Sequence, residues 1–215
     1  RHLRALDAVI NRGQNGAISY CNGTICMRPH LSMSRRTRRT PFSSRVEAAG
    51  ASGYTVYNHT LLATSFRGIE VDYWHLCENV QVWDVSCEKQ VTLMGPGANQ
   101  LAQYMTPRDL TNTKVGRCYY LPMCDENGNM MNDAVAIKVN DRHWRLSVAD
   151  SDVLLWAKGL AIGFGLDVEV REPDIFPLAV QGPKAKELMC RVFGDEIKDL
   201  GFFAIAPFIY NGQRM

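Results

Sequence analysis

The sequence predicts an α+β fold in which mixed sheets are flanked by helices. Segments with period-2 alternation and segments with helical spacing both occur, but they do not follow the strict βαβ order that predicts a parallel sheet. Residues 118–139 are typical of a β-hairpin, because apolar runs flank the turn sequence DENGN, whose Asn and Gly accept positive φ. With 46% hydrophobic and 21% charged residues, the composition is that of a folded globular chain.

The first half of the chain predicts one arm followed by alternating helices and strands. The basic stretch 33–45 contains Pro41 and predicts an extended or loosely ordered arm. Glycine beside tyrosine in GASGYTVYN (50–58) predicts a turn that leads into a short strand. Apolar spacing predicts a helix that begins at residue 70, strands over 80–85 and 90–94, and an amphipathic helix over 97–105.

After the hairpin, the pattern predicts a strand over 143–149 and a helix over 152–164, for which Asp150 or Ser151 is the expected N-cap. Further strands are expected at 166–173, at 176–181 and near the end of the chain, with a helix that Gly194 terminates. Two strand–helix–strand modules, roughly 80–170 and 175 onward, would accommodate these elements.

Charge is unevenly distributed along the chain. Residues 1–45 hold nine Arg against Asp7, although the net charge of the whole chain is only +2. A nucleic-acid-binding arm at 35–39 is an alternative interpretation, but no interleaved aromatic residues support it. Residues 1–32 lack a sustained apolar period and are expected to be an unstructured extension or a non-native leader, with a targeting extension as the alternative. Residues 33–215 then form the folded domain.

Several classes of function lack their sequence signals. The seven Cys include no CxxC pair, which predicts reduced thiols and a cytoplasmic location, or a mitochondrial one if residues 1–32 are a transit peptide. No P-loop, GxGxxG or HExxH motif occurs, and the five His are scattered, so no metal is expected. No apolar run approaches the ~18 residues that span a membrane.

Four blocks in a fixed order carry a family resemblance. They are VQVWDVSCEKQVTLMGPGA (80–98), YMTPRDLT (104–111), GRCYYLPMCDENGNMMNDAVAIKV (116–139) and PLAVQGPKA (177–185). Together they resemble the aminomethyltransferase family of the glycine-cleavage T-protein, and most of all its branch that demethylates dimethylsulfoniopropionate. The resemblance covers roughly residues 33–213 and implies a folate-binding domain that uses tetrahydrofolate. It also implies that part of the pocket, including a Glu that holds the pterin, follows Met215, so the domain is expected to be incomplete at its C-terminus.

The resemblance implies catalytic roles for Asn132 and Asp133. In the T-protein the matching segment is Gly-Gly-x-x-Asp-Asp, and its first Asp faces the reactive folate nitrogens. A carboxylate can take up a proton and stabilise an iminium-like cation, whereas the amide of Asn132 can only orient groups by hydrogen bonds. A sulfonium donor already carries a good leaving group and needs alignment above all. The Asn-Asp pair therefore favours methyl transfer; the alternative is that both residues only cap the edge of the hairpin.

The resemblance assigns the other site residues one position at a time. Tyr57 is expected to line the substrate end, where an aromatic face attracts an onium cation, and Tyr54 and Trp83 are weaker candidates for the same role. The residues expected to bind the cofactor are Arg108, Tyr120, Ser147, Ala149, Asp150 and Ser151.

The resulting hypothesis is a tetrahydrofolate-dependent methyltransferase or demethylase. It would take a methyl group from dimethylsulfoniopropionate or a similar onium donor and give 5-methyltetrahydrofolate. The alternatives are aminomethyltransferase activity, or a non-catalytic folate-binding protein of the same fold. The expected partner is a small-molecule methyl donor, with no nucleic acid and no membrane, and the sequence leaves the oligomeric state open.

Overall fold

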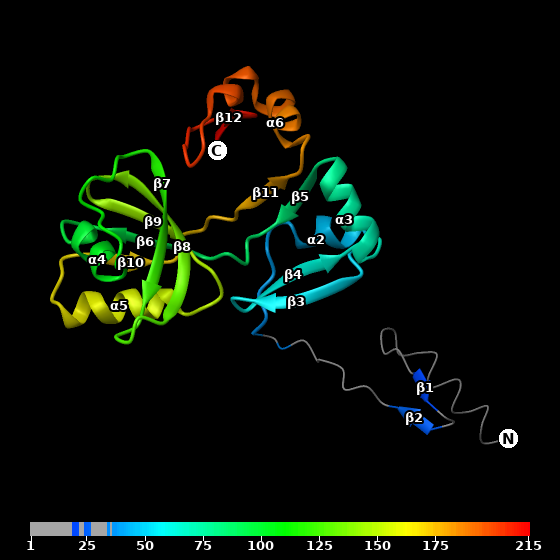
Figure 1. The fold of residues 1–215 in the computed structure, drawn as a ribbon, viewed down its shortest axis with the longest axis horizontal. Helices are drawn as coiled ribbons and strands as arrows, with labels where there is room; N and C mark the ends of the chain where they lie inside the picture. The colour runs from blue at the N-terminus through cyan, green and yellow to red at the C-terminus, as the bar shows by residue number, and fades with distance from the viewer. Residues whose placement is uncertain (1–18, 22–23, 27–33, 35) are drawn as a thin grey trace. The chain divides into compact units, whose positions relative to one another are not determined.

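The computed structural model describes residues 19–21, 24–26, 34 and 36–215 (Figure 1). The chain divides into two units, Arg1–Arg36 and Thr37–Met215. In the first unit, β1 (Ser19–Cys21) pairs antiparallel with β2 (Thr24–Cys26). The extension expected over residues 1–32 lies mostly outside the described residues and stays a prediction.

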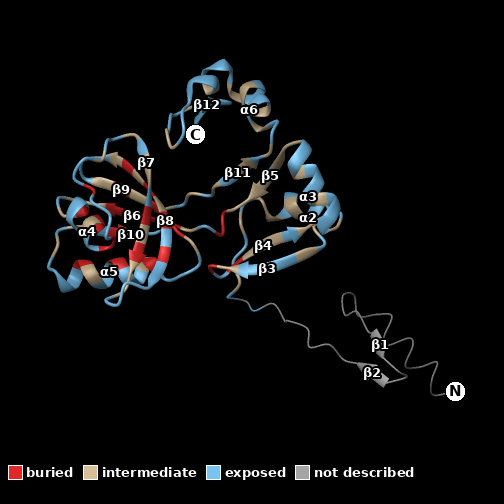
Figure 2. Ribbon diagram, in the orientation of Figure 1, coloured by how far each residue is buried: buried red, intermediate tan, exposed pale blue. Residues whose placement is uncertain are grey.

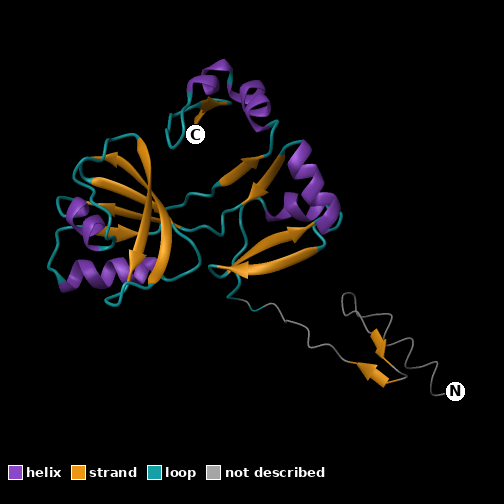
Figure 3. Ribbon diagram, viewed as in Figure 1, coloured by secondary structure: helices purple, strands orange, loops and turns teal. Residues whose placement is uncertain are grey.

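The second unit mixes helices and strands, which confirms the α+β class (Figure 3). No helix in the described part of the chain is long and apolar enough to cross a membrane. In chain order the elements are α2 (Ser43–Ala48), β3 (Gly53–Tyr57), β4 (Thr60–Ser65), α3 (Ile69–Glu78), β5 (Gln81–Asp84), β6 (Gln90–Met94), α4 (Ala98–Tyr104), β7 (Arg117–Cys124), β8 (Met130–Asn140), β9 (His143–Ser147), α5 (Val153–Gly163), β10 (Glu169–Arg171), β11 (Leu178–Gln181), α6 (Ala185–Phe193), the 3₁₀ helix η1 (Asp195–Asp199), β12 (Ile209–Tyr210) and β13 (Gln213–Arg214).

The main sheet has five antiparallel strands in the order β10-β6-β9-β8-β7. Its β7–β8 hairpin is the one expected from the DENGN turn. Helices α4 and α5 pack against one face through small residues, and Asn99 on α4 accepts a 2.7 Å hydrogen bond from the indole Nε1 of buried Trp144. Buried residues concentrate here (Figure 2). The fully enclosed members of this core are Leu93, Ala98, Leu101, Ala102, Leu121, Met123, Ala136, Leu146 and Ala157.

Because side chains alternate along a strand, every second residue of this sheet lies on the face that α4 and α5 do not cover, which we call the open face. Cross-strand partners share a face, so the register identifies its members. On β9 they are His143, Arg145 and Ser147, because Trp144 and Leu146 between them belong to the core. The members on the neighbouring strands are Gln90, Thr92, Met94, Asp133, Val135, Ile137, Tyr120, Pro122, Glu169 and Arg171.

The small sheets correct the expected modules. Strand β5 does not continue into the sheet of β6 but pairs antiparallel with β11, nearly a hundred positions later. Ser86, just after β5, donates a 3.3 Å hydrogen bond to the carbonyl of Pro177, just before β11. The expected modules 80–170 and 175 onward were therefore wrong, because β5 pairs with the distant strand β11 and not with β6, its neighbour in sequence. Strands β3 and β4 form a separate hairpin, as do β12 and β13.

Three local expectations also change. The stretch 33–45 is not wholly extended, since α2 begins at Ser43 after a turn around Pro41 that hydrogen bonds of Thr40 and Ser43 close. The N-cap position of α5 is Asp152 and no side chain caps it, so the capping roles of Asp150 and Ser151 were wrong. Their side chains instead accept hydrogen bonds from elsewhere in the chain. The expected last strand is reduced to the two-residue strands β12 and β13.

One glycine is required by a close approach of two backbones. Gly182 ends β11 with a φ of 117°, where side-chain-bearing residues are strained. A Cβ at this position would collide with the carbonyl oxygen of Asn79. The same carbonyl accepts a 3.1 Å hydrogen bond from the backbone N–H of Lys184, which joins the start of α6 to the end of α3.

Candidate functional site

A polar junction joins the β3–β4 turn to the ends of β8 and β9. We define the junction as Tyr57, Asn58, Asn132 and the segment 149–151. Two buried asparagine side chains hold that segment from opposite directions, and their exposed fractions are 8% for Asn58 and 5% for Asn132. Buried amides are stable in a protein only when their hydrogen bonds are made, and both of these amides make them.

The side-chain amide of Asn58 and its backbone N–H all make hydrogen bonds. Its Nδ2 donates to the carbonyls of Cys87 at 3.0 Å and Ala149 at 3.1 Å, and its Oδ1 accepts from the N–H of Ser151 at 3.0 Å. Its own N–H donates to Oδ1 of Asp150 at 2.7 Å. The residue has a φ of 47°, a left-handed conformation that asparagine tolerates better than other side-chain-bearing residues.

Asn132 binds the same segment from the sheet. Its Nδ2 donates to the carbonyl of Ala149 at 3.1 Å and to Oγ of Ser151 at 2.7 Å, and its Oδ1 accepts from the N–H of Ala149 at 3.2 Å. Asn132 lies on the core side of β8, so its amide orients backbone and not an open surface. The catalytic role expected for Asn132 stays a prediction, and its contacts give it a holding role.

Asp133 points the other way, to the open face, and is exposed. Partial burial and, second, the charge of Asp133 raise the pKa of the Glu88 carboxyl. The pKa of Tyr57 is raised by burial above all and by the charges of Glu88, Cys87 and Asp150. Tyr57 is therefore influenced by two carboxylates, Glu88 and Asp150, which come from two different segments of the chain.

Three of the six expected cofactor residues, Ser147, Tyr120 and Arg108, are connected across the sheet, whereas Ala149, Asp150 and Ser151 belong to the junction. Ser147 is the direct neighbour of Gln90, whose Nε2 donates a 2.7 Å hydrogen bond to the Ser147 hydroxyl, and of Val135 on β8. Val135 in turn neighbours Tyr120 on β7. The guanidinium of Arg108 donates a 2.9 Å hydrogen bond to the carbonyl of Tyr120. Ser147, Tyr120 and Arg108 are thus connected across the strands of the sheet, from β9 through β8 to β7.

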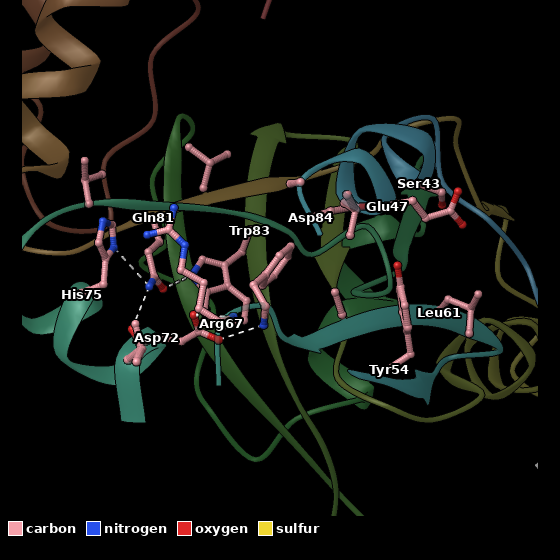
Figure 4. A pocket seen from close by; sticks show the side chains of 17 residues that line it. Ser43, Glu47, Tyr54, Leu61, Arg67, Asp72, His75, Gln81, Trp83 and Asp84 are labelled. Carbon is pink, nitrogen blue, oxygen red and sulfur yellow. Dashed lines mark hydrogen bonds between the residues drawn. The ribbon is translucent and has the colours of Figure 1, made fainter. Parts of the chain in front are cut away.

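Two of the expected substrate residues lie apart from the junction. Tyr54 and Trp83 line a cavity of about 290 Å³ beside α2, α3 and β3–β5, and Tyr57 does not line it (Figure 4). His75, Gln81 and Asp72 lie at one end of this cavity and Tyr54 at the other.

The walls of this cavity are aromatic and acidic. Phe66 joins Tyr54 and Trp83 as an aromatic wall, and Glu47 and Asp84 contribute carboxylates. Trp83 is fixed by a 3.1 Å hydrogen bond from its indole Nε1 to Oε1 of Gln81. Such walls suit a small organic cation.

A second cavity, of about 260 Å³, borders the junction itself. Asn58 and Ser151 line it together with Lys89, Arg38 and Glu172. Arg38 donates a 2.7 Å hydrogen bond to Glu172, which also lies 3.9 Å from the ammonium group of Lys89. On this side the junction therefore borders a cavity lined by two cations, Arg38 and Lys89, and two carboxylates, Asp152 and Glu172.

Two residues of this region were missed by reasoning from the sequence. Asn58 had a weak signal, since Asn before His59 in a short turn between two strands favours left-handed backbone. Glu88 had none, because an acid in a connecting segment is normally solvated. In the described part of the chain, no group of three or more His, Cys, Asp or Glu is placed to hold a metal ion.

Comparisons with known proteins identify relatives of this chain. The family model of the GCVT N-terminal domain matches residues 42–215. A dimethylsulfoniopropionate demethylase of Ruegeria pomeroyi is 52% identical over 85% of this chain and 50% of its own length. An aminomethyltransferase of Thermosipho melanesiensis is 26% identical over 59% of this chain and 36% of its own length.

A solved structure shows the same fold. The crystal structure of the glycine cleavage system aminomethyltransferase T from Bartonella henselae matches with a TM-score of 0.69 over 78% of this chain and 46% of that chain, at 21% identity. The chain thus spans about half the length, or less, of these relatives.

Proposed function

This chain belongs to the GCVT N-terminal domain family, and from that premise we propose that it is the folate-binding part of a tetrahydrofolate-dependent methyltransferase. The proposed donor is dimethylsulfoniopropionate or a similar onium compound, and the proposed product is 5-methyltetrahydrofolate. The observation that carries the proposal is the 52% identity to a dimethylsulfoniopropionate demethylase across 85% of this chain. The reduced state of the five cysteines whose side chains the structure describes is consistent with a cytoplasmic location.

Tetrahydrofolate would supply the nitrogen that accepts the methyl group, and the open face offers groups that fit it. Tyr120 presents an aromatic ring, and Ser147 presents a hydroxyl on the same row, held by a hydrogen bond from the buried amide of Gln90. Asp133, at the end of the neighbouring strand, is the free carboxylate of this region and can accept hydrogen bonds from the N–H groups of a pterin ring. These residues would hold and orient the cofactor.

The donor would lie against Tyr57. An onium cation is attracted both by an aromatic face and by carboxylates, and the carboxylates of Glu88 and Asp150 act on Tyr57. Methyl transfer by displacement needs the methyl carbon aligned within ~3–3.5 Å of the accepting nitrogen. Asn58 and Asn132 would contribute by fixing the segment 149–151 that separates donor from cofactor.

Identity to the relatives ranks the two activities. The chain is 52% identical to a dimethylsulfoniopropionate demethylase and 26% identical to an aminomethyltransferase, so we rank methyl transfer first and aminomethyl transfer second. A non-catalytic folate-binding protein would bind tetrahydrofolate without turnover.

The product of the reaction tests the proposal. The full-length protein that contains this chain is incubated with tetrahydrofolate and dimethylsulfoniopropionate, and separately with tetrahydrofolate and an aminomethyl-loaded carrier protein. We expect 5-methyltetrahydrofolate from the first mixture, and methylenetetrahydrofolate from the second would favour the alternative activity. Tyr57→Ala should raise KM for the donor while Tyr54→Ala should not. The reverse pattern would place the donor in the cavity of Tyr54 and Trp83 and contradict our assignment.

A further inference from the structure

A row of cationic side chains crosses the open face of the main sheet. Arg145 on β9 and Arg171 on β10 are both direct cross-strand neighbours of Thr92 on β6. The two arginines therefore stand on the same face, one on each side of the Thr92 hydroxyl, about 10 Å apart at their Cα atoms. His143 lies two residues before Arg145 and on the same face of β9.

Two of these side chains carry buried donors that nothing in the described part of the chain satisfies. Nε2 of His143 and Nε of Arg145 are enclosed but have no hydrogen-bond partner. No other side-chain nitrogen or oxygen among the described residues is both enclosed and unpaired. Folded proteins satisfy nearly all such atoms, and Arg145 as a whole is only partly buried, so a ligand that reaches its guanidinium can supply the missing acceptor.

Carboxylates of the chain do not neutralise the row. Within the described residues, Arg145 forms no salt bridge, and Arg171 lies 3.7 Å from Glu169 in a pair whose side chains are 58% and 60% exposed. Exposed pairs of this kind contribute little. Burial, followed by the charges of Arg145 and Arg171, lowers the pKa of His143, which places all three groups in one field.

We propose that Arg145, Arg171 and His143 bind a carboxylate group of a ligand on the open face. The planar guanidinium of Arg145 matches a carboxylate with two parallel hydrogen bonds, and His143 can donate a further one. Ser147, where the cofactor is expected, is two residues from Arg145 on the same face of β9, about 7 Å away along the strand. This inference rests on the proposed function, because it takes the ligand to be the folate or the methyl donor.

The carboxylate could come from either ligand. The glutamate tail of tetrahydrofolate carries carboxylates far from its pterin ring, and dimethylsulfoniopropionate carries one on a short chain. Four residue steps along β9 separate Ser147 from His143, which is about 13–14 Å. This length accommodates tetrahydrofolate, the longer of the two molecules, with its pterin end at Ser147. The two sources predict different results when Arg145 is replaced.

Binding to Arg145→Gln separates these sources. If the site holds the glutamate tail, Kd for tetrahydrofolate should rise about 10- to 100-fold, the equivalent of losing a charge-assisted hydrogen-bonded pair. Kd for 6-methyltetrahydropterin, which has no carboxylate, should not change. If the site holds the donor, the loss should appear for dimethylsulfoniopropionate and not for ethyldimethylsulfonium. Unchanged binding of all four compounds would overturn the proposal.

Two further variants control for folding and for charge. Arg145→Lys keeps the positive charge but not the planar fork, so its Kd should lie between those of the wild type and Arg145→Gln. Arg191→Gln removes an exposed arginine of α6 that pairs with Glu187, and it should bind every compound as the wild type does. If Arg191→Gln lost as much affinity as Arg145→Gln, the loss would come from the change in net charge alone, and the proposed site would be overturned.

A direct readout separates failure of the site from failure of the proposed function. The Nε–H resonance of Arg145 is followed by nitrogen-edited NMR as glutarate, a plain dicarboxylate, is added. We expect a saturable shift that Arg145→Gln removes, together with a rise in the pKa of His143. This shift would support the site even if the protein bound neither folate nor donor, while its absence from a folded wild-type protein would contradict the site.

Discussion

Replacing Asn58 by alanine should destabilise the protein by about 3–5 kcal/mol. The side chain makes three hydrogen bonds of 3.0–3.1 Å inside the junction, and each contributes roughly 0.5–1.5 kcal/mol net. The backbone φ of 47° adds about 1 kcal/mol, because alanine tolerates left-handed backbone less well than asparagine. The carbonyl of Cys87 would also lose its partner, whereas the carbonyl of Ala149 keeps the hydrogen bond from Asn132.

Thermal and urea unfolding measure this change. At roughly 2–4 °C per kcal/mol for a chain of this size, the midpoint should fall by about 6–20 °C. Asn58→Gly should be less damaging than Asn58→Ala by about 1 kcal/mol, since glycine removes the hydrogen bonds without the backbone strain. Asn112→Ala, on an exposed turn, is the matched control and should change little. A loss below 1 kcal/mol in Asn58→Ala would refute the view that this amide holds the junction.

Three further predictions rest on charge and burial. Asp133→Asn should lower the pKa of Glu88 and raise the unfolding midpoint at pH 7. The gain in stability should vanish at acidic pH, where both carboxyls are protonated. An unchanged pKa of Glu88, measured by carbon NMR, would contradict the interaction between the two carboxyls. Burial raises the pKa of the Cys87 thiol to about 11, so iodoacetamide at pH 8 should label exposed Cys77 and leave Cys87 unmodified in a peptide map, and equal labelling would be the contrary result. The pKa of His143 is lowered in the folded state, so its contribution to stability is present above about pH 6.5 and is lost as pH falls. His143→Gln should therefore make the unfolding free energy depend less steeply on pH in this range. An unaltered pH dependence would contradict the lowered pKa.

Local chemistry made much of the fold predictable. The β7–β8 hairpin followed from one turn sequence, and α4 followed from four apolar residues at helical spacing, three of which are fully buried. Gly194 ends α6 with a φ of 96°, as its position after the last apolar residue indicated. These features depend on interactions within a few residues, which a single sequence displays.

Pairings between distant segments were not predictable in the same way. Nothing in β5 indicates that it pairs with β11 and not with its neighbour in sequence. The expectation that Asp150 caps a helix was sound by local rules, but the N–H of Asn58, 92 positions away, takes that carboxylate. Glu88 gained its place beside Tyr57 for the same reason, because the tertiary fold and not the local pattern brings the two together.

The most direct measurement follows the methyl group itself. Dimethylsulfoniopropionate labelled with ¹³C in one S-methyl group is mixed with tetrahydrofolate and the protein, and the products are observed by NMR. Our account predicts that the label appears on N5 of 5-methyltetrahydrofolate with an equal amount of the demethylated thioether acid, and that Asp133→Asn slows both. Unchanged donor in the presence of bound tetrahydrofolate would contradict methyl transfer and leave a folate-binding protein without this activity.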